Sequence, residues 1–276
     1  MSKRALSLIV LTLAALLVLA ACGGQATKAP AAVTKAPATQ TPATATQAPA
    51  ATKAPTLSGN PIRGGVLYDN WIEALGVEAP EGDQPLWKTQ TTNTRTGADT
   101  WRCKECHGWD YKGVEGAYGS GSHKTGFKGI FASASLSEAD IIAWLNGTKN
   151  PDHNFSAYFE DAQYKMLAAF IKGGMADMSI YINADKTVKG GNIDHGRELY
   201  NSTCKICHGE DGKAINFSDE AAPEYVGTIA ADNPWELWHK TSVGQPGKAM
   251  AAGLNLDWKP QDFADLLTYA QTLPTK

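Results

Sequence analysis

The amino-acid sequence predicts an all-α fold with two tandem helical domains behind a disordered tether. Three observations lead to this prediction. Each half of the chain ends in a segment whose apolar residues recur at helical spacing, each half carries helix-capping signals, and each half contains one C-x-x-C-H unit. The halves are therefore internal repeats of one helical unit. We expect the first domain over residues 61–185 and the second over residues 186–276.

The first 21 residues are typical of an export signal. Lys3 and Arg4 precede the apolar run LSLIVLTLAALLVLAA, as the charged and apolar regions of a secretory signal do. The end of this run together with Cys22, LAAC, resembles the lipobox of bacterial lipoproteins. The resemblance implies cleavage before Cys22 and attachment of a diacylglycerol to its sulfur. We therefore expect residues 1–21 to be a lipoprotein signal peptide, with an uncleaved membrane helix as the alternative.

The lipidated Cys22 would begin a flexible linker over residues 22–60. This segment is built from alanine, threonine, proline and lysine without any aromatic residue. Such a composition buries too little apolar area to offset its chain entropy, so the linker should stay extended and mobile. It would act as a tether or as a spacer of no particular length.

The charge of the chain gives no reason to expect a nucleic-acid partner. The full chain has a net charge of −3, and loss of Lys3 and Arg4 with the signal would make it about −5. No basic cluster with interleaved aromatic residues occurs in the sequence.

Four of the five cysteines form two C-x-x-C pairs, and a histidine follows each pair directly. Paired cysteines in an exported protein are also found in disulfides, in zinc sites and in thioredoxin-like redox motifs. None of these alternatives requires the adjacent histidine, whereas attachment of haem does, because the thiols bind the porphyrin and the histidine binds the iron. We therefore expect two covalently bound haem c groups, held by Cys103, Cys106 and His107 and by Cys204, Cys207 and His208.

With these units the folded part resembles the c-type cytochrome family, in two tandem domains over residues 61–276. The pentapeptide GRELY at residues 196–200 precedes the second unit, and GGVLY at residues 64–68 opens the first half. The resemblance implies an opening helix whose glycine and aromatic residue pack on the last helix. The expected last helices carry apolar stripes at Tyr164, Leu167, Ala168 and Ile171, and at Phe263, Leu266, Leu267, Ala270 and Leu273.

A further helix is expected between the C-x-x-C-H unit and the last helix of each half. In the first half, Ser137 and Asp140 form a capping-box pattern. In the second half, Asn233 should cap a helix with Pro234 in its first position. The two helices contain Trp144 and Trp238 and run to Gly147 and Gly244.

The sixth iron ligand is expected in the loop after this helix, where the family usually carries a methionine. Six residues beyond Gly244 stands Met250, and six residues beyond Gly147 stands His153. The repeat register thus predicts iron ligation by His208 and Met250 in the second domain and by His107 and His153 in the first. The alternatives for the first iron are His123, Met166, Met175 and Met178.

Two histidines and one long segment have no expected part in iron binding. His195 and His239 should be structural or exposed. The segment between Tyr68 and Cys103 is an insertion relative to the second half, and it contains Trp71, Trp87 and Trp101. It should wrap its own domain and shield the haem; the alternative is that it covers the contact with the second domain or binds a partner.

Two six-coordinate irons would leave no position open to a substrate, so the chain is expected to carry electrons rather than act as an enzyme. The expected partners are a membrane oxidoreductase and a soluble cytochrome, with lipid anchoring outside the cytoplasm, in the periplasm or at the cell surface. A peroxidase-like dihaem enzyme, in which the first iron loses its distal ligand, is the alternative. A thiosulfate dehydrogenase would need a cysteine ligand, and no cysteine is left for it.

Overall fold

The computed structural model describes residues 58–276. The expected signal peptide, the lipidation of Cys22 and nearly all of the linker lie outside these residues.

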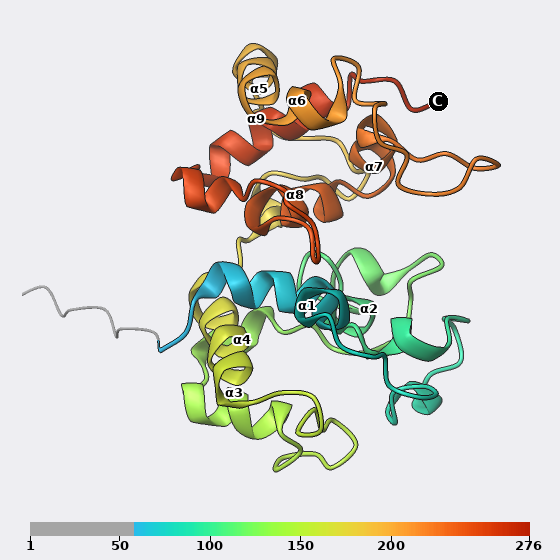
Figure 1. Ribbon diagram of the computed structural model, residues 1–276, viewed down its shortest axis with the longest axis vertical. Helices are drawn as coiled ribbons and strands as arrows, with labels where there is room; N and C mark the ends of the chain where they lie inside the picture. Colours follow the sequence, from blue (N-terminus) through green and yellow to red (C-terminus); the bar gives the residue numbers. More distant parts are fainter. Residues whose placement is uncertain (1–57) are drawn as a thin grey trace, which may run out of the picture. The chain divides into compact units, whose positions relative to one another are not determined.

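The prediction of an all-α fold is confirmed for the part of the chain that the structure describes (Figure 1), where β-structure is limited to three isolated bridges. The α-helices are α1 (Pro61–Leu75), α2 (Cys103–His107), α3 (Glu138–Leu145), α4 (Asp161–Gly173), α5 (Ile193–Leu199), α6 (Lys205–His208), α7 (Val226–Asp232), α8 (Pro234–Val243) and α9 (Pro260–Ala270). Short 3₁₀-helices are η1 (Trp87–Thr89), η2 (Gly97–Trp101), η3 (Ala117–Gly119), η4 (Phe131–Ser135), η5 (Met178–Ile180) and η7 (Gly253–Leu256), and η6 (Tyr200–Cys204) is a π-helical turn.

The helices form two groups with the same internal packing. In the N-terminal group, α1–α4, the helix α1 packs on α4, and in the C-terminal group, α5–α9, the helix α5 packs on α9. A glycine lies at each crossing: a Cβ atom on Gly64 would overlap the carbonyl group of Met166, and one on Gly196 would overlap that of Asp265. The expectation that the opening glycine packs on the last helix is therefore confirmed in both groups.

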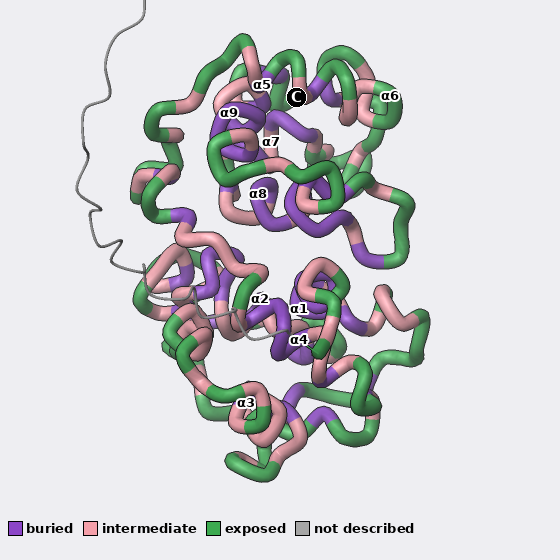
Figure 2. Tube along the Cα trace, turned by 90° about the vertical axis from the view of Figure 1, so that its left-hand side faces the viewer, coloured by how far each residue is buried: buried purple, intermediate pink, exposed green. Residues whose placement is uncertain are grey.

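The buried faces of α4 and α9 are those that the apolar stripes predict. Every residue of both stripes is buried, and Figure 2 shows these helices with long buried stretches. Burial of such stripes supplies most of the stability of short helices, because helices of this length are marginal in isolation.

The expected side-chain cap is present in the N-terminal group and absent from the C-terminal group. The Ser137 side chain accepts a hydrogen bond from the backbone N–H of Asp140 at 3.0 Å, as a capping residue does. The helix α8 begins at Asn233 and Pro234 as predicted, but the Asn233 side chain donates its amide to Glu236 at 2.9 Å and makes no cap hydrogen bond to the backbone. The cause is α7, a helix that the sequence did not predict, which ends at this same asparagine and holds its backbone at ψ 68°.

The insertion between α1 and α2 is folded onto the N-terminal group. Its tryptophan side chains donate to backbone carbonyl groups, from Trp87 to Arg95 at 2.8 Å and from Trp101 to Gly82 at 3.1 Å, and Trp71 of α1 donates to the carbonyl group of Trp101 at 2.9 Å. Satisfied indole N–H groups allow these large side chains to be buried without an unpaired donor. In the C-terminal group, the five residues of η6 stand in place of this insertion.

Candidate functional site

The first C-x-x-C-H unit forms a helix of its own, α2. The helix ends at Gly108, whose φ of 79° is accessible mainly to glycine. The hydroxyl of Tyr68 on α1 donates to the carbonyl oxygen of Gly108 at 2.6 Å, so α1 holds the end of α2 directly after His107. The opening aromatic residue of the repeat therefore positions the histidine that follows the two cysteines.

His107 and His153 lie opposite each other, with ring centroids 6.2 Å apart. Each ring directs Nδ1 at a backbone carbonyl oxygen, His107 at that of Lys128 at 2.7 Å and His153 at that of Trp144 at 2.9 Å. A carbonyl oxygen only accepts, so Nδ1 carries the proton in both rings and Nε2 keeps its lone pair. This is the arrangement in which histidine binds a metal ion, with its other nitrogen held by a hydrogen-bond acceptor.

The surroundings keep both imidazoles neutral. Burial, reinforced by the neighbouring His153, lowers the pKa of His107 to about 4. Burial also lowers the pKa of His153 below its ordinary value. Two neutral imidazoles can face one metal ion without mutual repulsion, and neutral imidazole is the form that binds metals.

An apolar cavity lies beside the two histidines and the two thiols of α2. Burial raises the pKa of Cys103 to about 12 and raises the pKa of Cys106 further, and neither thiol forms a disulfide. The insertion closes one wall of the cavity, as expected of a segment that shields a haem. The lining residues are Gln84, Leu86, Thr100, Trp101, Arg102, Cys103, Cys106, His107, Phe127, His153 and Phe155.

His123, one of the alternative ligands for the first iron, is engaged elsewhere. Its ring stacks on Tyr118 at 4.8 Å, and its Nδ1 lies 3.7 Å from the carboxylate of Glu105, beyond hydrogen-bonding distance. Burial alone would raise the pKa of Glu105, but His123 together with Lys104 and Arg95 lowers it to about 2. His123 thus belongs to a polar cluster around Glu105.

The three methionine alternatives belong to α4 and the segment after it. Met178 is fully buried in the core. Met166 and Met175 are half-buried and pack against the same core. Of the candidates for the second ligand of the first iron, His153 is the one that lies beside His107. Its role as an iron ligand stays a prediction.

The second C-x-x-C-H unit repeats the framework of the first. The hydroxyl of Tyr200 donates to the carbonyl oxygen of Gly209 at 2.8 Å, as Tyr68 does to Gly108. His208 has a buried Nδ1 atom with no hydrogen-bond partner among the described residues, and its ring lies 5.7 Å from that of Phe217. At the first site a backbone carbonyl oxygen accepts from Nδ1 of His107, whereas among the described residues no such acceptor lies at Nδ1 of His208.

Met250 lies in the loop after α8, where the repeat register places it. It lines a cavity with Ile62, Arg63 and Val66 of α1. Among the described residues, no contact between His208 and Met250 is recorded, so their joint ligation of one iron stays a prediction.

The residues at both sites suit a haem. At the first site, Cys103 and Cys106 would hold the porphyrin and His107 and His153 the iron, because an apolar cavity and two lone-pair nitrogens lie together. At the second site, the exposed apolar side chains Ile215 and Phe217, the latter beside His208, are features that a bound group would cover. When bound, haem supplies an iron that alternates between its ferrous and ferric states.

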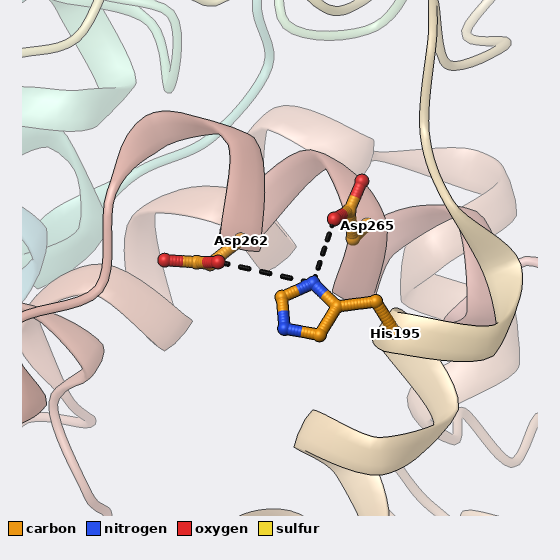
Figure 3. Close-up of side chains that lie close together, drawn as sticks. All are labelled: His195, Asp262 and Asp265. Atoms are coloured by element: carbon orange, nitrogen blue, oxygen red, sulfur yellow. Dashed lines mark hydrogen bonds and ion pairs between the residues drawn. The ribbon is translucent and has the colours of Figure 1, made fainter.

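A third group of possible metal ligands lies at the crossing of α5 and α9 (Figure 3). His195 directs Nδ1 at Asp265 at 2.8 Å and lies 3.8 Å from Asp262. The other oxygen of Asp265 accepts hydrogen bonds from the Asn192 backbone at 2.7 Å and from the Gln261 side chain at 2.7 Å. Both oxygens of the Asp265 carboxylate are therefore already engaged in contacts within the protein. The group is an ion pair between His195 and Asp265 that joins α5 to α9.

Of the two interpretations expected for His239, structural or exposed, the structure supports the structural one. This histidine is fully buried between the two helical groups, in contact with Tyr111 and Gly65. The local sequence shows His239 next to Trp238 in α8, but it does not reveal which distant residues cover it.

Within residues 58–276, every helix is too short or too polar to span a membrane. Residues 191–270 match the family model described as Cytochrome C oxidase, cbb3-type, subunit III. Comparison with curated proteins found no match, and neither did comparison with solved structures. The matched range contains Cys204, Cys207, His208 and Met250. The match supports a c-type cytochrome, a class that binds haem c covalently and transfers electrons.

Proposed function

We propose that this protein is an extracytoplasmic dihaem c-type cytochrome that carries single electrons between two redox partners. The observation that carries the proposal is the pair His107 and His153. Their ring centroids lie 6.2 Å apart beside two free thiols, and each Nδ1 donates a hydrogen bond to a backbone carbonyl group. A redox metal held by two such nitrogens needs no substrate position to accept and release an electron.

The count of two haems is supported by the repeated framework. The family match covers the C-terminal helical group. The N-terminal group has the same tyrosine-to-glycine hydrogen bond after its C-x-x-C-H unit and the same glycine at its helix crossing. We infer that residues 61–185 and 186–276 are two domains of one kind, each with its own haem.

The proposed ligand sets give the two haems different properties. His107 and His153 would hold the first iron, and His208 and Met250 the second. With both axial positions filled by the protein, neither iron offers a place for a substrate, which favours a carrier over an enzyme.

The proposed location and partners follow from the N-terminal sequence and from the family match. The export signal and Cys22 favour lipid anchoring outside the cytoplasm. The matched family is described as a subunit of a cytochrome c oxidase, which is in keeping with a membrane oxidoreductase as one partner and a soluble cytochrome as the other.

The test combines haem quantification with EPR spectroscopy of the oxidised, haem-loaded protein. Unaltered protein should contain two haems per chain, both low-spin. His153→Ala should convert one haem to the high-spin form and Met250→Ala the other. His123→Ala and Met175→Ala are matched controls that should leave both haems low-spin, because these residues lie in other contacts.

Three results would overturn parts of the proposal. A single haem per chain contradicts the dihaem assignment. A high-spin haem in the unaltered protein means an open iron and favours the peroxidase-like enzyme. Conversion to high spin by His123→Ala or Met175→Ala, but not by His153→Ala, would mean that the first iron has a different ligand.

A further inference from the structure

The helix α8 inserts the side chain of His239 into the N-terminal helical group. The residue is 0% exposed. Its Nε2 lies 3.0 Å from the carbonyl oxygen of Gly65, and its Nδ1 lies 2.8 Å from the hydroxyl of Tyr111. Because the carbonyl group only accepts, Nε2 carries the proton and Nδ1 accepts from the tyrosine. Both nitrogens of a neutral imidazole are therefore used in contacts with the other helical group.

Four aromatic rings of the N-terminal group surround this imidazole. The ring centroids lie 5.2 Å from His239 for Trp109, 5.7 Å for Tyr68 and 5.8 Å for Tyr111 and Phe170. A side chain that is fully buried, fully hydrogen-bonded and enclosed by aromatic rings has the properties of an interface hot spot.

The next residue of α8, Lys240, makes a second contact with the N-terminal group. Its Nζ lies 2.7 Å from one carboxylate oxygen of Asp69, and Arg102 lies 2.9 Å from the other. Asp69 is 0% exposed, so removal of either cation would leave a buried negative charge under-compensated. His239 and Lys240 both lie on α8 and both contact the N-terminal group, so α8 is the helix that joins the two groups.

These contacts adjoin both candidate haem sites. Tyr68, which borders His239, also holds Gly108 after His107, and Arg102 directly precedes Cys103. On the other side, α8 leads into the loop that carries Met250. A shift of α8 relative to α1 would therefore move the framework of one site relative to the other.

We propose that His239 and Lys240 are positioning residues that dock the C-terminal helical group onto the N-terminal group and so fix the separation of the two haems. The inference rests on the proposed dihaem function. Two domains joined by a short connection move relative to each other by default unless their interface is strong. Electron transfer between two centres slows steeply as they separate, so a fixed docking would keep the transfer fast.

The experiment compares His239→Ala with His195→Ala in the haem-loaded full chain. Both changes remove a histidine that forms a hydrogen-bonded contact, but only His239 lies between the helical groups. Small-angle X-ray scattering and calorimetry report docking, haem quantification reports loading, and flash reduction reports electron transfer between the haems.

For His239→Ala we expect a larger maximum dimension, two separate unfolding transitions and docking weakened by at least about tenfold, as for loss of an interface hot spot. Electron transfer between the haems should be slower as a result. His195→Ala should keep the scattering profile and the transfer rate of the unaltered protein. Tyr111→Phe and Lys240→Met should shift the scattering in the same direction, and they provide the test if His239→Ala does not fold.

Unchanged scattering and a single unfolding transition in folded His239→Ala, or in both Tyr111→Phe and Lys240→Met, would overturn the docking. An equal change for His195→Ala would also overturn it, because the effect would then be general destabilisation. If the scattering changes as expected but the chain holds fewer than two haems, the docking stands and the proposed function fails.

Discussion

At the scale of single residues, two tyrosines hold the two candidate haem sites in the same way. Each donates its hydroxyl to the carbonyl group of the glycine that follows C-x-x-C-H. Tyr200→Phe removes this donor and keeps the ring. We expect a loss of about 1 kcal/mol in unfolding free energy, and a fall in Tm of roughly 2–4 °C for a chain of this size, measured by calorimetry.

The neighbouring Tyr269 provides the control for this substitution. Its ring lies 5.4 Å from that of Tyr200, but no hydrogen bond of its hydroxyl is recorded among the described residues. Tyr269→Phe should leave Tm within about 1 °C of the unaltered value. An equal fall for both variants would contradict the role of the Tyr200 hydroxyl.

His195 makes the stability of the α5 and α9 crossing dependent on pH. Its hydrogen bond to Asp265 raises the pKa of His195 above its ordinary value. Burial alone would raise the pKa of Asp265, but the Asn192 backbone, His195 and Gln261 lower it. The stabilisation from His195 is therefore complete below its unfolded pKa of about 6.5, and it is lost as the pH rises through the raised folded value.

We expect the Tm difference between unaltered protein and His195→Gln to be largest near pH 5.5 to 6, below the ordinary pKa of histidine of about 6.5, and to shrink as the pH rises above it through the raised folded value. Asp265→Asn should reduce this pH dependence, because it removes the partner that contributes most to the raised pKa of His195. A Tm difference that stays constant from pH 5.5 to pH 8.5 would contradict the ion pair.

At the scale of the helices, two glycines allow the crossings of α1 with α4 and of α5 with α9. A Cβ atom at either position would overlap a backbone carbonyl group of the partner helix, which has no free rotation to move aside. Gly196→Ala should therefore cost about 1–3 kcal/mol in unfolding free energy, the usual cost of overpacking, measured by denaturant unfolding.

Glu198→Ala is the control on the same helix, because Glu198 is exposed. It should change the unfolding free energy by less than about 0.5 kcal/mol. If Gly196→Ala had the same effect, or stabilised the protein through the higher helix propensity of alanine, the close crossing would be disproved.

At the scale of the whole molecule, the two proposed ligand sets predict two reduction potentials. Methionine ligation raises the potential relative to ligation by two histidines. A spectroelectrochemical titration should give two midpoints, with the haem of Met250 at the higher one, so that electrons rest on the second haem. His153→Met should raise the lower midpoint and narrow the gap, whereas His123→Met should leave both midpoints in place. A single shared midpoint would contradict the ligand assignment.

Much of the fold and part of the candidate site could be predicted from local sequence signals. The stripes of α4 and α9 and the Ser137 cap follow from helix geometry, which depends on residues three or four positions apart. The proximity of His153 to His107 followed from the repeat register. The start of α8 at Asn233 and Pro234 was predicted correctly, but the side-chain cap expected of Asn233 is absent, because an unrecognised helix, α7, ends at that residue and controls its backbone.

The sequence by itself determined the all-α class, the repeated helix crossings and the two C-x-x-C-H units, because each depends on residue type at fixed spacing. Only the tertiary structure decided that the insertion lines the first cavity, that Met250 lies beside α1 and that His239 is enclosed by the other helical group. These contacts join segments far apart in the chain, up to 174 positions for His239 and Gly65. A local pattern shows which face of a helix is buried, but it does not show which distant residues cover that face.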